Sequence, residues 1–118
     1  MSDVIYKIVT EALWAETRQS GVFDGASIDL TDGYIHFSTA EQAQQTAAKY
    51  FDGQEGLVLV AIDVARLAEK LPGKLVWEPS REGALFPHLY APLPFDAVLW
   101  EKPLPIGGDG RHQFPEMS

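Results

Sequence analysis

The chain has 118 residues, 46% of them hydrophobic and 22% charged, which is ordinary for one globular domain and too short for two independent cores. It contains no cysteine, which excludes disulfides, thiolate zinc sites and a cysteine nucleophile. Its formal net charge of -8, with nine scattered lysines and arginines, argues against a nucleic-acid partner.

The first predicted elements are a strand over residues 4–9 and the helix that follows it. The strand is a run of β-branched and aromatic residues. Thr10 is a good helix N-cap, and the helix is expected to end before Gly21. Within residues 27–33, the pair Asp32-Gly33 favours a positive φ angle, so we expect a turn there.

A second strand is predicted over residues 34–38, where apolar and polar residues alternate. Thr39 then caps a helix over residues 40–51, with Gln42 at the spacing of a capping box. Residues 57–62 form the most hydrophobic run, which predicts the central strand. The remaining predictions are a short helix from Asp63 to Leu71, a strand at 75–78, a loop at 79–87, and strands at 89–90 and 97–100.

These elements predict one α+β domain over residues 1–105, with mixed or antiparallel sheets and two main helices, followed by a flexible tail over residues 106–118. No phosphate-loop, dinucleotide-binding or nucleophile-elbow motif is present. The N-terminus does not resemble a signal peptide, and no apolar stretch approaches the roughly 20 residues that span a bilayer. We therefore expect a cytoplasmic monomer that binds no membrane.

The candidate site begins with the strand at 34–38. Alternation places Tyr34, His36 and Ser38 on one face, opposite the apolar Ile35 and Phe37. A histidine beside a serine on a polar face is typical of a polar pocket. The alternative is that His36 has a purely structural role and is simply hydrogen-bonded.

Two further segments carry polar groups that could join this pocket. Glu78 follows the large apolar Trp77 at a strand end, a setting in which burial can shift a carboxyl pKa or fix an acceptor. His88 and Tyr90 share one face, because Pro87 holds the chain extended before them. The alternatives are an exposed acid for Glu78 and an edge strand for His88 and Tyr90. Two further alternatives are a metal site formed by His36, His88 and Glu78 and a Ser-His-acid hydrolase, but the sequence has neither metal-ligand spacing nor an oxyanion loop to support them.

The motifs of the chain, taken in order, resemble a bacterial family from about residue 4 to residue 100. They are IYKI at 5–8, GYIHFS at 33–38, EQ at 41–42, LVLVAID at 57–63, WE at 77–78 and FPHLYAPL at 86–93. The family is the one catalogued as domain of unknown function 952. The resemblance implies a fold like that of the ADP-ribosyltransferase superfamily, whose members bind NAD in a cleft between two small sheets.

The resemblance also implies roles for the candidate residues. Glu78 and His36 would be catalytic, and NAD would be the co-substrate. The ligand-binding residues would be Tyr6, Lys7, Tyr34, Ser38, Trp77, His88 and Tyr90. Many members carry a histidine where this chain has Lys7, which could meet a phosphate as a point charge. Two hypotheses follow: an ADP-ribosyl-type transferase, or a non-catalytic module that binds a nucleotide or other small ligand.

Overall fold

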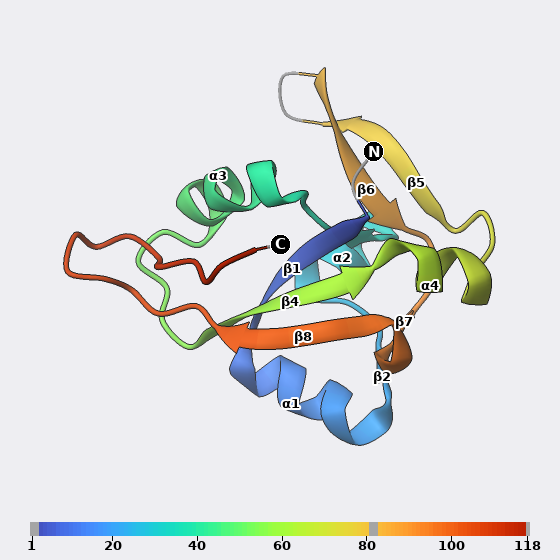
Figure 1. Ribbon diagram of the computed structural model, residues 1–118, viewed down its shortest axis with the longest axis horizontal. Helices are drawn as coiled ribbons and strands as arrows, with labels where there is room; N and C mark the ends of the chain where they lie inside the picture. Colours follow the sequence, from blue (N-terminus) through green and yellow to red (C-terminus); the bar gives the residue numbers. More distant parts are fainter. Residues whose placement is uncertain (1–2, 81–82, 118) are drawn as a thin grey trace.

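The computed structural model describes residues 3–80 and 83–117, and its centre is a three-stranded antiparallel sheet (Figure 1). The strands are β1 (Val4–Thr10), β4 (Leu57–Asp63) and β8 (Val98–Pro103), in the order β1-β4-β8. The most hydrophobic run of the sequence therefore forms the central strand, as predicted. All seven residues of β1 pair with β4, from Val4 opposite Asp63 to Thr10 opposite Leu57.

Two smaller antiparallel sheets complete the strands. One has the order β3-β6-β5, and the other is a two-stranded pair of β2 and β7. Their bounds are β2 (Val22–Phe23), β3 (Ile35–His36), β5 (Leu75–Ser80), β6 (Ala84–Leu89) and β7 (Leu93–Pro94). A bridge joins the two three-stranded sheets, because Tyr6 N–H donates to Ser38 O at 2.7 Å and Ser38 N–H donates to Tyr6 O at 2.9 Å.

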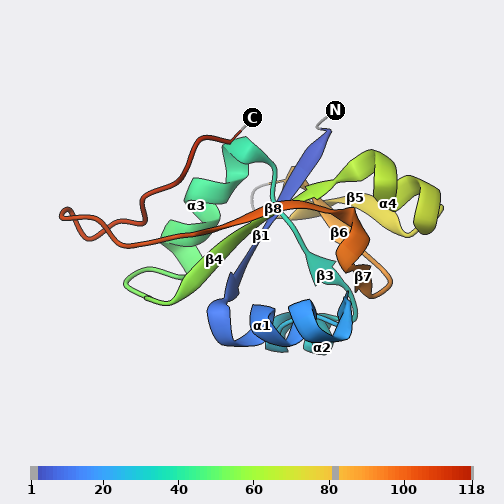
Figure 2. The same cartoon turned by 60° about the horizontal axis from the view of Figure 1, so that its bottom comes forward.

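The two main helices, α1 (Glu11–Ser20) and α3 (Ala40–Tyr50), lie on opposite sides of the central sheet (Figures 1 and 2). Their starts are those that the sequence predicts. Thr10 Oγ1 accepts a hydrogen bond from Leu13 N–H, and Thr39 forms a capping box with Gln42. The shorter helices are α2 (Ser27–Asp32), α4 (Val64–Lys70) and the 3-10 helix η2 (Phe95–Ala97).

Strand alternation divides the core into two clusters, one on each face of the central sheet. Ile5 and Val9 of β1 face the first cluster, which includes the fully buried Trp14 of α1. Tyr6 and Ile8 face the second cluster, which includes Ala47 of α3. The chain is thus α+β with antiparallel sheets and a core on both faces of the central sheet.

The predicted loop at 79–87 is wrong for most of its length. Residues 81–82 lie outside the described residues, but β5 continues to Ser80, β6 begins at Ala84, and the two strands pair up to Ser80 opposite Ala84. Pro79 is tolerated because β5 is an edge strand. Pro87 lies in the middle strand, where its carbonyl accepts from Phe37 N–H at 3.0 Å. Pro87 has no N–H to return this bond, which explains why β3 is only two residues long.

The turn expected within residues 27–33 lies at Gly33, but the sequence did not predict that residues 27–32 before it form helix α2. Gly33 has the positive φ angle that the sequence indicates, 88°, but it uses this conformation to end the helix. Its N–H donates to Asp29 O at 2.9 Å. The only buried side chain of α2 is the carboxylate of Asp29, so the helix shows no apolar periodicity by which it could be recognised.

The C-terminal segment follows the core rather than leaving it. Leu104 is buried, and Phe114 and Met117 pack against the second core cluster. His112 Nε2 donates to Gln54 O at 2.8 Å, and Ile106 pairs with His112 in an isolated bridge. The flexibility expected for residues 106–118 stays a prediction. Within residues 3–80 and 83–117, no helix has the length and apolar character needed to cross a membrane.

Candidate functional site

A group of closely packed aromatic and imidazole rings forms where β3 meets β6. His36 and His88 are directly opposite each other in this pair of strands. The Tyr34 ring lies against both, with centroid distances of 4.6 Å to His36 and 4.2 Å to His88. The Tyr90 ring follows at 5.2 Å from Tyr34. Four of the sequence-predicted residues therefore meet in one cluster, because strand alternation and the β3–β6 register put them on one face.

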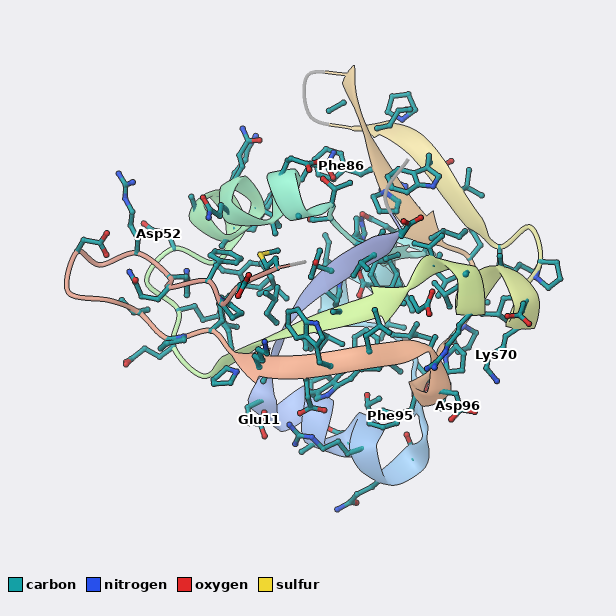
Figure 3. The ribbon with its side chains drawn as sticks, in the orientation of Figure 1. Glu11, Asp52, Lys70, Phe86, Phe95 and Asp96 are labelled. Atoms are coloured by element: carbon teal, nitrogen blue, oxygen red, sulfur yellow. The ribbon has the colours of Figure 1, made fainter. Side chains whose placement is uncertain are left out.

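A cavity of about 490 Å³ lies next to this ring cluster, beside the edge strand β1. We call it the β1 cavity. Phe86 lies on the α3 side of β6 and contributes to its wall (Figure 3). The wall also includes polar groups from β1, β3 and α3. The lining residues are Tyr6, Lys7, Ile8, Ile28, Asp32, Tyr34, His36, Phe37, Ser38, Thr46, Tyr50, Phe51, Phe86 and His88.

Asp29 holds together the charged groups on one side of this cavity. Its carboxylate lies 2.9 Å from Lys7 Nζ and 2.6 Å from His36 Nδ1. It also accepts the backbone N–H groups of Ala26 at 2.8 Å and His36 at 3.0 Å. Gly25 leaves room for the Asp29 side chain, because a Cβ atom at position 25 would lie only 2.8 Å from the Asp29 Cβ. We call Lys7, Asp29, His36 and Asp32 the Asp29 cluster.

The charged groups of the Asp29 cluster pair with one another. Burial alone would raise the pKa of Asp29, but the hydrogen bond from His36 and the charge of Lys7 outweigh it and lower the pKa to about 2. Burial lowers the pKa of Lys7, and the adjacent Asp29 offsets part of this effect. His36 Nε2 also contacts Asp32 Oδ2 at 3.0 Å, so both ring nitrogens of His36 face carboxylates.

Glu78 makes the second set of polar contacts, with His88 and Tyr90. Its Oε1 accepts the Tyr90 hydroxyl at 2.7 Å and lies 2.8 Å from His88 Nδ1. These hydrogen bonds, from Tyr90 first and then His88, lower the pKa of Glu78. The same contact raises the pKa of Tyr90 to about 12, so the phenol remains a donor. We call Glu78, His88 and Tyr90 the His88 cluster.

Eight of the nine predicted site residues lie at the β1 cavity or contact a residue that lines it. Those that line it are Tyr6, Lys7, Tyr34, His36, Ser38 and His88. Glu78 and Tyr90 lie behind His88 and reach the cavity through it. The structure does not bring Trp77 to the cavity, since its side chain packs against the first core cluster. Alternation explains this, because Trp77 and Glu78 point to opposite faces of β5.

Two of the predicted ligand-binding residues have structural contacts as well. Tyr6 is buried and packs against Trp100, with ring centroids 5.9 Å apart. Ser38 Oγ is 3.0 Å from Thr46 Oγ1 of α3. Within residues 3–80 and 83–117, no three histidine or acidic side chains are placed to hold a metal ion.

Sequence reasoning missed Asp29, Asp32 and Thr46. Asp29 is 22 residues from Lys7 along the chain, and nothing in the local pattern links the two. A signal was present in part, because Asp29 and Asp32 lie at helical spacing just before the GYIHFS motif. That spacing becomes informative only once residues 27–32 are known to be helical.

A second cavity, of about 560 Å³, lies between α3 and the C-terminal segment. Its lining includes Asp52 near the end of α3, which Figure 3 places beside that segment. Arg111 and His112 come from the segment itself. This cavity contains no residue of the Asp29 or His88 clusters.

Comparison with known proteins gives the family. The model of the family described as "Protein of unknown function (DUF952)" matches residues 8–101, so the chain belongs to this family. The crystal structure of protein CC0527 from Caulobacter crescentus is 48% identical, with 93% of each chain covered and a TM-score of 0.84. The solution NMR structure of CC0527 is 47% identical and has a TM-score of 0.82, covering 95% of this chain and 93% of that one. Both are structural genomics targets. No curated protein matches the chain.

Proposed function

We propose that the chain binds a small nucleotide-like ligand in the β1 cavity, and that NAD is the first candidate. The observation that carries the proposal is the wall of closely packed Tyr34, His36 and His88 rings on a cavity of about 490 Å³. This volume lies in the range of small-molecule sites, which combine apolar walls with a few fixed polar groups. The ADP-ribosyltransferase-like fold implied by the family resemblance is part of this proposal.

The observed contacts change which residues we expect to bind the ligand. Lys7 is paired with Asp29, so it is not available as a free charge for a phosphate. His36 is engaged at both ring nitrogens. We therefore assign the planar part of the ligand to Tyr34, through ring stacking, and the polar contacts to Ser38 and His88. The chain would act as a monomer on a small molecule.

A second candidate function is ADP-ribosyl transfer, and the observation in its favour is the contact of the Glu78 carboxylate with His88 in the cavity wall and with Tyr90. Hydrogen bonds from Tyr90 and His88 hold this carboxylate in its charged form. Breaking the bond between nicotinamide and ribose passes through an oxocarbenium-like state, which a nearby carboxylate stabilises. The alternative of a non-catalytic binding module uses the same cavity without this step.

Calorimetry with NAD at millimolar concentration tests the proposal. We expect wild-type protein to bind, and His88→Ala to weaken binding by at least about tenfold through the loss of one hydrogen bond and ring contact. His112→Ala is the matched control, because it removes a histidine from the second cavity and should leave the affinity unchanged. Thermal denaturation of both variants would verify that they fold. Absence of NAD binding, or equal effects of the two variants, would contradict the proposal.

A nicotinamide-release assay separates the two functions. In a transferase, Glu78→Gln keeps the shape but removes the charge, so release should fall by roughly two orders of magnitude or more, a far larger loss than that of NAD binding. A binding module releases no nicotinamide in either form. ADP-ribose and other nucleotides in a thermal-shift screen would identify the ligand if NAD does not raise the melting temperature.

A further inference from the structure

The ring of His88 has one nitrogen that is not used within the protein. Its Nδ1 contacts Glu78 Oε1 at 2.8 Å. Its Nε2 has no hydrogen-bond partner in the part of the chain that the structure describes, although the side chain is only 5% exposed. His36, in the same wall, differs because both of its ring nitrogens contact carboxylates. A buried polar atom without a partner is unusual and calls for an explanation.

The proton on the His88 ring can be placed from its partner. Glu78 is ionised, so its oxygens only accept hydrogen bonds, and Oε1 already accepts the Tyr90 hydroxyl. His88 Nδ1 must therefore carry a proton and donate it to Glu78. In the neutral ring, this leaves a lone pair on Nε2, which makes that atom a hydrogen-bond acceptor.

The contacts of the ring also indicate where this lone pair points. The Nδ1 edge faces Glu78, which is not part of the cavity wall, whereas His88 itself is. The Tyr34 ring covers one face of His88, with an interplanar angle of 31°. These contacts leave the Nε2 edge, together with the ring face away from Tyr34, as the parts of His88 that can face the β1 cavity.

We propose that Nε2 of His88 is a preformed hydrogen-bond acceptor through which the β1 cavity selects ligands that carry an N–H or O–H donor. Glu78 is then a positioning residue, which fixes the ring orientation and the tautomer. This inference rests on the proposed function in that the cavity takes a ligand. It adds the class of ligand, because a carboxylate or a methylated group at that position would leave the buried acceptor unpaired. A carboxamide or a ribose hydroxyl supplies the required donor.

Long-range 1H–15N correlation spectra of the full chain at neutral pH test the tautomer without any ligand. We expect His88 to carry its proton on Nδ1. Glu78→Gln should shift the ring toward a mixture of tautomers, since the amide can donate as well as accept. Tyr90→Phe is the matched control: it removes the other donor to Glu78 but keeps the carboxylate, so the tautomer should be unchanged. A proton on Nε2 in the wild type would overturn the inference.

Reaction with diethyl pyrocarbonate, followed by mass spectrometry, tests access from the cavity. An unprotonated imidazole nitrogen attacks a carbonyl carbon of the reagent and displaces ethyl carbonate. His88 should be labelled at least about tenfold faster than His36, the internal control, because both nitrogens of His36 are engaged. Faster labelling of His36, or an unreactive His88, would overturn the inference.

Ligand protection separates this inference from the proposed function. NAD, which has a carboxamide, should slow the labelling of His88 more than its analogue with a carboxylate in place of that carboxamide. If His88 reacts first but neither dinucleotide protects it, NAD binding fails while the open acceptor stands. Stronger protection by the carboxylate analogue would overturn the donor preference.

Discussion

The Asp29 and His88 clusters lie on the same cavity but handle their polar groups in opposite ways. In the Asp29 cluster, a carboxylate with 1% side-chain exposure receives two side chains and two backbone N–H groups. In the His88 cluster, the Glu78 carboxylate is 35% exposed and contacts Nδ1 of the buried His88 ring. Nε2 of that ring has no hydrogen-bond partner among the described residues. The first arrangement is closed and suits a structural role. The second is open toward the cavity and suits contact with a ligand.

This difference shows that burial and charge do not by themselves identify a functional residue. Lys7 is the most deeply buried cation of the site, yet its charge is paired with Asp29. This ion pair connects helix α2 to the central sheet. The informative feature is the unused hydrogen-bonding capacity of a buried group. By this criterion His88 ranks above Lys7 and His36 as a ligand contact.

Removing the central carboxylate of the closed cluster should have the largest effect on stability. Asp29→Ala leaves Lys7 buried without its partner, and we expect it to lower the free energy of unfolding by about 3 to 5 kcal/mol. Urea denaturation measures this change. Asp32→Asn is the control, because Asp32 is 37% exposed and its loss should cost less than about 1 kcal/mol. Equal effects of the two changes would contradict the closed role of Asp29.

The pH dependence of the free energy of unfolding also tests the structural role of Asp29. The folded-state pKa of Asp29 is about 2, below the value of about 3.9 expected in the unfolded chain. Because the folded-state value is the lower one, this stabilisation is present above about pH 4 and is lost as the pH falls toward 2. The loss should be about 2 kcal/mol. The free energy of unfolding, measured at pH 6, 4 and 3, should fall less with acid in Asp29→Ala than in wild type. An identical pH dependence in the two proteins would contradict the low pKa of Asp29.

Replacing both partners of the buried pair gives a smaller effect than breaking it. The double change Lys7→Met with Asp29→Leu removes both charges, so no ion is left unpaired, and we expect a loss at least about 2 kcal/mol smaller than that of Asp29→Ala. His36 loses its Asp29 contact in both proteins, which makes the comparison fair. A double variant less stable than Asp29→Ala would show that the pair is worth more than its desolvation cost.

The open cluster should show almost no effect on stability. Tyr90→Phe removes only the hydroxyl that donates to the solvent-accessible Glu78. We expect the urea midpoint to stay at the wild-type value within error, because exposed polar contacts contribute little. A clear loss of stability would mean that the His88 cluster, like the Asp29 cluster, is structural.

The sequence predicted the parts of the fold that depend on local patterns. The hydrophobic run at 57–62 marks the central strand, and the caps at Thr10 and Thr39 mark both main helices. The strand at 75–78 was predicted, but its extension to Ser80 and its pairing with β6 were not, since two prolines mask strands that are set by pairing with their neighbours. Helix α2 could not be predicted either, because it docks through a carboxylate rather than an apolar face.

For the site, alternation was sufficient to group His36 with Tyr34 and His88 with Tyr90. The contacts between segments far apart in the sequence could not be predicted, because they depend on the register of β3 and β6 and on the position of α2. The sequence therefore assigned Lys7 and Trp77 to a ligand, whereas the structure uses Lys7 in an ion pair and Trp77 in the core. Folding partners that lie far apart in sequence decide which polar groups remain free.

Amide chemical-shift mapping of the full chain during an NAD titration tests the central claim most directly. The β1 cavity and the second cavity have comparable volumes, so their responses can be compared in one experiment. We predict that NAD shifts the resonances of Tyr34, Ser38 and His88, and leaves unchanged those of Gln44 and His112, which line the second cavity. Shifts confined to Gln44 and His112, or no shifts at millimolar NAD, would contradict the assignment of the β1 cavity as the ligand site.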